Sequence, residues 1–248
     1  MGQKTTSSGA ENVVFGAAIQ GQRSEQQDSF CSIWLPKERA WLLIIADGMG
    51  GHAAGEVASR IAVDTFITSF NAARSAGTGL EEALNLSLDS ANARIASTQR
   101  ASPETIGMGT TLVAAHLSTN GLAWISVGDS PLWLYRADKL IRLNEDHSLR
   151  GAVAAGARGV GNLLQSALNG QTIALIDCRA QPYPLLAGDL VLISSDGLLT
   201  LTEDEIAATV RQSSVGGPEA ITRAILDAVE DRRKSNQDNC AVVVASVI

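Results

Sequence analysis

Residues 41–52 read Trp41-Leu42-Leu43-Ile44-Ile45-Ala46-Asp47-Gly48-Met49-Gly50-Gly51-His52, so an apolar run passes directly into a glycine-rich turn. A short apolar run that ends at such a turn is typical of a buried β-strand. Asp47 follows the strand at once, where the backbone is a rigid mount for its carboxylate. The neighbouring glycines leave room for backbone carbonyls and water to approach a bound ion. This stretch therefore indicates a strand end that can carry chemistry.

Similar β-like runs occur along both halves of the chain, between glycine-rich and polar segments. Their apolar and β-branched content and their length of four to eight residues are those of strands. The expected strands are Val13–Ile19, Ser29–Leu35, Ala40–Ala46, Thr110–Leu117, Leu122–Val127, Leu132–Tyr135, Ile173–Asp177, Leu190–Ser194 and Cys240–Val247.

Two helices are expected between the third and fourth of these strands, and two more before the last one. Apolar residues could share one broad face in the first helix, and they recur at spacings of four and three in the second. Thr202 is expected to cap the third helix, whose acidic first residues suit the positive end of a helix dipole. The apolar positions are Val57, Ile61, Phe66 and Phe70 in the first helix; Leu80, Leu84, Leu88, Ala91 and Ile95 in the second; and Ile221, Ile225 and Val229 in the fourth.

This order of elements predicts an α+β fold. Runs of strands beside segregated helices favour antiparallel sheets in layers over alternating parallel β-α-β units. At 248 residues the chain fits one large domain, residues 13–248, after a flexible N-terminal tail of residues 1–12 that is rich in Ser, Thr and Gly. We expect a short flap at about residues 148–170, because Arg150–Gly161 is rich in Gly and Ala and shows no clear period.

Composition excludes several classes of protein. A formal net charge of −7 argues against nucleic-acid binding, which needs clustered Lys and Arg. The longest apolar runs are far shorter than the roughly 20 residues that span a bilayer, and no signal peptide is visible, so no membrane insertion is expected. Cys31, Cys178 and Cys240 are odd in number and widely spaced. They predict reduced thiols in a cytoplasmic protein.

Five aspartates lie at the ends of the expected strands: Asp28, Asp47, Asp129, Asp196 and Asp238. One Asp-Gly pair is usually only a turn. Several carboxylates at the strand ends of one layered scaffold are costly unless cations neutralise them. Oxygen ligands with few imidazoles suit Mn²⁺ or Mg²⁺ better than zinc or copper. The residues alone therefore favour a two-metal hydrolase.

An ordered set of motifs is more specific than any one aspartate. Arg-x-x-x-x-Asp is followed by Asp-Gly-Met-Gly-Gly-His, Gly-Met-Gly-Thr-Thr, Val-Gly-Asp-Ser, Ser-Asp-Gly-Leu and Gln-Asp-Asn. This set, from about Val13 to Val247, resembles the type 2C metal-dependent protein serine/threonine phosphatases (the PPM family), bacterial branch. The resemblance implies a four-layer α-β-β-α sandwich, with two central antiparallel sheets flanked by helix pairs.

The resemblance also implies roles for individual residues. Asp47 would bridge two metal ions, with the Gly48 carbonyl as a further ligand, and Asp196 and Asp238 would hold the first ion. Asp28 would serve the second ion through coordinated water, and Asp129 with Asp196 matches the site of a third. Arg23 would bind the substrate phosphate, since its planar fork suits phosphate oxygens. His52 is a candidate substrate contact, with a structural role at a helix start as the alternative.

The chain departs from the family pattern at three places. Gln27 stands where many relatives carry a glutamate, which weakens one expected metal ligand. Met49 stands where some relatives carry a histidine that is proposed as a general acid, so water is expected to protonate the leaving alkoxide. The segment Arg150–Asn162 is shorter than the usual flap, which leaves the cleft more open and the substrate less defined.

The resemblance implies phosphorylated proteins as substrates, a cognate serine/threonine kinase as a partner, and a monomer. Three other readings remain open. The first is a phosphoprotein-binding module without activity, although all five aspartates are kept. The second is the related branch that acts on small anti-sigma-factor antagonists, although Arg23 and Met-Gly-Gly-His favour the kinase-opposing branch. The third is a metal-dependent nuclease, which the acidic charge opposes.

Overall fold

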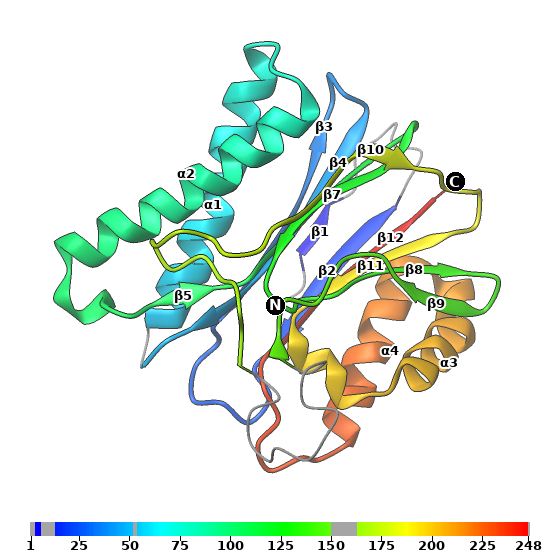
Figure 1. The fold of residues 1–248 in the computed structure, drawn as a ribbon. Helices are drawn as coiled ribbons and strands as arrows, with labels where there is room; N and C mark the ends of the chain where they lie inside the picture. The colour runs from blue at the N-terminus through cyan, green and yellow to red at the C-terminus, as the bar shows by residue number, and fades with distance from the viewer. Residues whose placement is uncertain (1–2, 6–12, 52–53, 150–162, 248) are drawn as a thin grey trace.

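The structure, a computed structural model, describes residues 3–5, 13–51, 54–149 and 163–247. Two antiparallel sheets stack face to face, and a pair of helices covers the outer face of each sheet (Figure 1). The layers therefore follow the order helices, sheet, sheet, helices, and the predicted four-layer α+β sandwich is confirmed. His52 and the greater part of the predicted flap lie outside the described residues.

The first sheet has the strand order β1-β2-β12-β11-β8-β9. Its central pairs are β12 with β2 and β12 with β11, all antiparallel. Helices α3 and α4 cover this sheet (Figure 1). The bounds are β1 Gln3–Thr5, β2 Val14–Ile19, β8 Leu132–Arg136, β9 Lys139–Arg142, β11 Leu190–Ser194, β12 Cys240–Ser246, α3 Glu203–Ser213 and α4 Gly217–Asp231.

The second sheet has the strand order β10-β7-β6-β4-β3, and the short strand β5 pairs with the end of β4. Helices α1 and α2 pack on its outer face (Figure 1). The bounds are β3 Asp28–Leu35, β4 Ala40–Met49, β5 Gly109–Thr110, β6 Leu112–Ser118, β7 Gly121–Val127, β10 Asp177–Tyr183, α1 Ala54–Ser75 and α2 Leu80–Ala101.

Strand β4 shows why residues 41–46 are apolar without a break. Side chains alternate across a strand, so Leu42 and Ile44 face the helix pair, whereas Leu43 and Ile45 face the other sheet. Both faces are covered, and all residues from Ala40 to Ala46 are fully buried. A strand buried on both faces needs apolar residues at every position.

The helices follow the expected periodicity with one shift. In α1 the most buried stripe runs through Ala58, Ala62 and Phe66, whereas Val57 and Ile61 are only partly buried at its margin. Small alanines on the stripe let the helix approach the sheet closely. At the start of α3, Thr202 accepts a hydrogen bond from the Glu205 backbone N–H, and the Glu205 side chain accepts one from the Thr202 N–H. This capping box confirms the predicted helix start.

The sequence prediction fails at one strand and omits two. Ile173–Asp177 is wrong, because β10 begins only at Asp177 and Leu175 and Ile176 precede it as exposed residues. Strand β10 is defined by its pairing with β7 rather than by apolar content, which is usual for an edge strand. Strand β9 was not predicted, and neither was β1 within the tail of residues 1–12; the rest of that tail lies outside the described residues.

The three cysteines are free, as predicted. Among the described helices, none combines the length and the low polarity that crossing a bilayer would require.

A half-buried ion-pair cluster closes the β3–β4 turn onto α1. Arg74 binds both Glu38 carboxylate oxygens, at 3.0 and 2.9 Å, and His116 Nε2 lies 3.0 Å from Glu38 Oε2. These contacts, with the His116 hydrogen bond first, lower the pKa of Glu38 from its ordinary 4.5 to about 2. A lowered folded-state pKa means that the stabilisation is fully present above pH 4.5 and is lost as the pH falls toward 2.

We therefore expect Glu38→Gln to lower the free energy of unfolding by about 1–3 kcal/mol at pH 6, since Arg74 and His116 lose a charged partner. The deficit should shrink as the pH falls below 4.5, because Glu38 of the unfolded wild-type chain then binds a proton while the folded protein, with its pKa of about 2, does not. Urea unfolding at pH 6 and pH 3 measures both effects, with the exposed Glu104→Gln as the control. An equal deficit at both pH values would contradict the assignment.

Candidate active site

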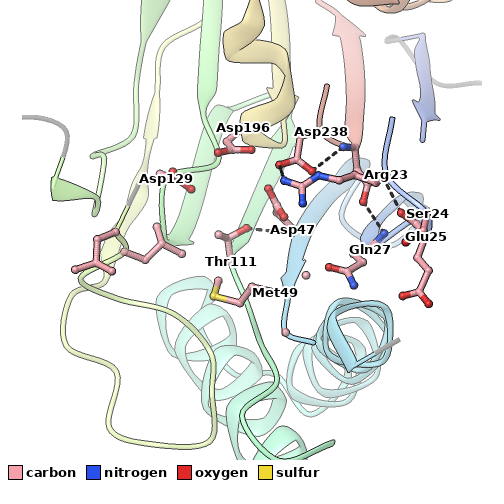
Figure 2. A pocket seen from close by; sticks show the side chains of 15 residues that line it. Arg23, Ser24, Glu25, Gln27, Asp47, Met49, Thr111, Asp129, Asp196 and Asp238 are labelled. Atoms are coloured by element: carbon pink, nitrogen blue, oxygen red, sulfur yellow. Dashed lines mark hydrogen bonds and ion pairs between the residues drawn. The ribbon is translucent and has the colours of Figure 1, made fainter. Parts of the chain in front are cut away.

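A cleft of about 680 Å³ opens at one end of the two sheets, where loops from both sheets meet. Carboxylates lie at its base, and Arg23, Ser24 and Glu25 lie together on one side (Figure 2). The lining residues are Arg23, Ser24, Glu25, Gln27, Asp47, Gly48, Met49, Gly50, Thr111, Asp129, Leu163, Leu164, Asp196, Asp238 and Asn239.

Strand register brings four of the predicted aspartates to this end. Asp28, the first residue of β3, is directly opposite Asp47 of β4 in their antiparallel ladder. Asp196 follows β11 and Asp238 precedes β12, and these two strands are paired neighbours in the other sheet. Ser195 Oγ donates a 2.6 Å hydrogen bond to Asp28 Oδ2, so the two sheets are joined where the carboxylates meet.

Asp129 reaches the cleft from the turn after β7. Gly128 in this turn has φ +103°, and a Cβ there would lie 2.6 Å from a Thr111 methyl, so only glycine fits. Arg142 Nη2 donates to the Asp129 carbonyl at 2.9 Å. Asn144 Nδ2 donates to the Ser130 carbonyl at 2.9 Å. His147, to which sequence analysis gave no chemistry, accepts a 3.2 Å hydrogen bond from the Gly128 N–H and is a structural residue.

The backbone of Asp47 is held on both sides by the Thr110-Thr111 pair. The Asp47 N–H donates to Thr111 Oγ1 at 3.0 Å, and the Asp47 carbonyl accepts from Thr110 Oγ1 and the Thr111 N–H, both at 2.9 Å. The Asp47 carboxylate is thereby fixed as it points into the cleft (Figure 2). The threonines of Gly-Met-Gly-Thr-Thr thus position the aspartate of Asp-Gly-Met-Gly-Gly-His.

Gly48 and Gly55 let the start of α1 pack directly on the end of β4. A Cβ on Gly48 would lie 2.1 Å from the Gly55 carbonyl, and a Cβ on Gly55 would lie 2.6 Å from Gln27 Oε1. A side chain at Gly48 would require the helix to move, whereas one at Gly55 would displace the Gln27 side chain. The end of α1 nearest the cleft is therefore set by contact with the strand that carries Asp47.

The carboxylates are buried close together and repel one another. Burial raises the pKa of Asp28 to about 7, with Asp196 and Asp238 adding repulsion against the hydrogen bond from Ser195. Burial also raises the pKa of Asp47 well above its ordinary value, and Asp28, Asp196, Asp129 and Asp238 raise it further. Asp28 Oδ1 is buried and has no hydrogen-bond partner among the described residues. A positive charge close to these groups would lower the pKa of Asp28 and of Asp47 and would give Asp28 Oδ1 a partner.

The donor set fits a hard divalent cation. Within the described part of the chain, the cleft is lined by carboxylate, hydroxyl, amide and carbonyl oxygens and by no histidine or cysteine, which suits Mg²⁺ or Mn²⁺ and not zinc. Among the described residues, no group of three or more His, Cys, Asp or Glu side chains is arranged to hold a metal ion by itself. A cation bound here would take water and backbone carbonyls as further ligands, as is usual for Mg²⁺.

Arg23 lies at the rim of the same cleft. Its Nη2 donates to Asp238 Oδ2 at 2.6 Å, and the two side chains are 56% and 41% exposed. Figure 2 shows the guanidinium beside Asp238 and above Asp47. Such an exposed pair contributes little stability and is easily exchanged for another partner. Arg23 is therefore close enough to the carboxylates to meet an anion bound over them.

Of the residues predicted from sequence, Arg23, Asp47, Gly48, Asp129, Asp196 and Asp238 line the cleft, and Asp28 lies directly behind Asp47. His52 cannot be placed, because it lies outside the described residues. Sequence reasoning gave no role to Ser195, Thr111 or Asn239. All three lie inside motifs that the sequence analysis singled out, and Ser195 and Asn239 adjoin an aspartate in the chain, which was the available signal.

The protein phosphatase 2C model matches residues 15–233. The chain belongs to the protein phosphatase 2C family. It is 32% identical over 222 residues to the serine/threonine protein phosphatase PstP of Mycobacterium tuberculosis, over 84% of this chain but only 41% of that protein. It is 31% identical over 203 residues to the serine/threonine phosphatase stp of Listeria innocua, over 76% of this chain and 80% of that one.

A solved structure supports the same relationship. The catalytic domain of the serine threonine protein phosphatase PstP, in complex with two manganese ions, superimposes with a TM-score of 0.77 at 27% identity. The superposition covers 96% of this chain and 98% of that domain. The fold of this protein phosphatase 2C chain is therefore that of a domain that binds divalent metal in a relative.

We expect Asp47→Asn to stabilise the metal-free protein, because one charge is removed from a crowded anionic cluster. In EDTA the Tm should rise by roughly 2–8 °C, the range for a gain of about 1–2 kcal/mol in a domain of this size. Addition of Mn²⁺ should raise the wild-type Tm and should shift the variant much less. Differential scanning fluorimetry measures both, with the exposed Asp89→Asn as control. A lower Tm for Asp47→Asn in EDTA would contradict the electrostatic account.

Proposed function

We propose that this chain is a Mn²⁺- or Mg²⁺-dependent phosphatase that hydrolyses phosphoserine and phosphothreonine in proteins. The observation that carries the proposal is the convergence of Asp47, Asp129, Asp196 and Asp238 from both sheets on one cleft, with Asp28 paired opposite Asp47 and Arg23 at the rim. The names of the relatives support the same chemistry. Because the chain spans only 41% of the mycobacterial protein, its activity and partners are proposed here for this chain alone.

In the proposed site, Asp47 and the Gly48 carbonyl would serve both ions, and Asp196 and Asp238 would hold the first of them. Asp28 serves the second ion through water, and Asp129 with Asp196 provides for a third. When bound, the ions supply an acidified water for attack on phosphorus and stabilise charge on the phosphoryl oxygens. The protein contributes fixed geometry, since Thr110, Thr111 and Ser195 hold Asp47 and Asp28 in place.

Arg23 is proposed to bind the phosphate of the substrate. A guanidinium offers two parallel donors to phosphate oxygens, and an exposed side chain can leave its partner to make them. Exchange of Asp238 for a phosphate is favoured when Asp238 is engaged by a cation, because its charge is then already compensated. Arg23 would in this way position the phosphorus over Asp47.

The leaving group is proposed to take its proton from water. Met49 cannot donate a proton, and no histidine lines the described part of the cleft. The alkoxide of serine or threonine would then be protonated by solvent that enters the open cleft. His52 remains a proposed substrate contact.

The substrates are proposed to be phosphorylated proteins, with a cognate serine/threonine kinase as a partner, and the chain to act as a cytoplasmic monomer. Ser24 and Glu25 extend the wall beyond Arg23 and would meet residues that flank the phosphorylated one.

The first test is hydrolysis of an aryl phosphate and of a phosphothreonine peptide across a Mn²⁺ titration, with Asp196→Asn as the inactive control. We expect turnover that requires metal and is abolished in the variant. A folded wild-type protein that takes up Mn²⁺, binds the phosphopeptide and does not hydrolyse either substrate would instead identify a phosphoprotein-binding module.

A second test concerns the phosphate clamp. Arg23→Ala should raise KM for the phosphothreonine peptide roughly 10- to 100-fold with a smaller change in kcat, since a charged hydrogen bond of about 1.5–3 kcal/mol is lost. Arg60→Ala, which removes an exposed arginine on α1, is the matched control. An unchanged KM in Arg23→Ala would remove Arg23 from the site.

A further inference from the structure

We propose that Asn239 is a positioning residue that fixes the segment Gln20–Gln27, and with it Arg23, over the carboxylates. The inference rests on the proposed role of Arg23 in binding phosphate. The Asn239 amide is buried and contributes no charge and no metal ligand. It acts on substrate binding through the position of Arg23.

The Asn239 side chain uses both ends of its amide on this one segment. Its Oδ1 accepts a 2.9 Å hydrogen bond from the Gln27 N–H. Its Nδ2 donates to the Gln20 carbonyl at 2.8 Å and to the Glu25 carbonyl at 2.9 Å. The residue is only 5% exposed, so water cannot readily replace these partners. The bonded groups come before and after Arg23, so the amide closes the loop that presents the arginine.

Two more contacts join this loop to the same turn. The Gln22 N–H donates to the Gln237 carbonyl at 2.8 Å. Gly21 has φ +63°, and a Cβ at this position would lie 2.4 Å from the Asp238 carbonyl oxygen. The Arg23 loop therefore packs backbone to backbone on the turn that carries Asp238. The three hydrogen bonds of the Asn239 side chain add to this contact.

On its other side, Asn239 touches the turn that carries Asp196. A Cβ on Gly197 would lie 1.9 Å from the Asn239 carbonyl oxygen, so the two backbones are in direct contact. Asn239 thus lies between Asp196, Asp238 and the Arg23 loop. Within the described residues, the Asn239 side chain forms hydrogen bonds only with the loop, whereas its backbone lies against the turn that carries Asp196.

The role of the side chain can therefore be tested separately from that of the backbone. Loss of the amide should free the loop and displace Arg23, but leave the aspartates on their strands. No smaller side chain provides one acceptor and two donors in this geometry, and an aspartate would keep the acceptor for Gln27 and lose both donors.

The experiment compares Asn239→Ala with wild type, with Arg23→Ala and with the double variant, for Mn²⁺-dependent hydrolysis of a phosphothreonine peptide. Asn239→Ala should raise KM about tenfold, with kcat lowered less than threefold. In the Arg23→Ala background the same substitution should raise KM less than twofold, because the arginine that it positions is gone. Asn236→Ala, an exposed asparagine three residues away, is the matched control and should leave both constants unchanged.

Two readouts do not depend on turnover. The Mn²⁺-induced rise in Tm should persist in Asn239→Ala, since the carboxylates stay in place. Hydrogen exchange should accelerate in residues 20–27, which include the Gln22 and Gln27 amides, and remain slow in β4. If Asn239→Ala does not fold, Gly21→Ala tests the same contact, because its Cβ would push the loop away from Asp238.

Loss of the Mn²⁺ shift, a fall in kcat at constant KM, or fully multiplicative effects with Arg23→Ala would overturn the inference. Unchanged exchange of residues 20–27 in Asn239→Ala would do so as well. Failure of the proposed function is a different result: the wild-type protein itself would be inactive, while the exchange experiment would still decide whether Asn239 holds the loop.

Discussion

The hydrogen bond from Ser195 Oγ to Asp28 Oδ2 joins the two sheets at the point where their charges collect. Asp28 and Asp47 belong to one sheet, and Asp196 and Asp238 extend from the other. Only the stacking of the sheets brings these two pairs together, and burial with repulsion raises the pKa of Asp28 and of Asp47. The apolar packing between the layers therefore stabilises an arrangement that repulsion between the carboxylates opposes. A divalent cation neutralises this repulsion, so the same arrangement favours its binding.

The cleft combines a rigid floor with an adjustable rim. At the floor, Asp47 is held through its own backbone by Thr110 and Thr111, so its position does not depend on a flexible side chain. At the rim, Arg23 is more than half exposed and is held by one ion pair and by the loop below it. This difference suits the proposed chemistry, because the reacting water needs fixed ligands, whereas a phosphate group that enters and leaves needs a partner that can move.

The sequence predicted most of the fold because most elements are buried on a regular face. β4 and α2 show the clearest patterns, and both are present, although β4 continues beyond the expected end at Ala46 to Met49 and so includes Asp47. β10 was misplaced because an edge strand is specified by its neighbour β7, and its own residues are largely polar. The aspartates of the site were found because each lies at or beside the end of a strand. Asn239 and Thr111 were missed as positioning residues because their partners, Gln20, Glu25 and Asp47, are far away in the chain.

Gln27 shows how the electrostatics of the site constrain its composition. The Gln27 side chain lines the cleft and lies against Gly55 at the start of α1, close to the carboxylates. A glutamate there would add a further negative charge to a cluster in which Asp28 already has a pKa of about 7. The neutral amide lowers the repulsion in the metal-free protein and also lowers the attraction for a second cation. In the proposed two-ion site, glutamine at this position would therefore favour a stable metal-free state over tight binding of the second ion, and water held by Asp28 and Asp47 would supply the remaining coordination.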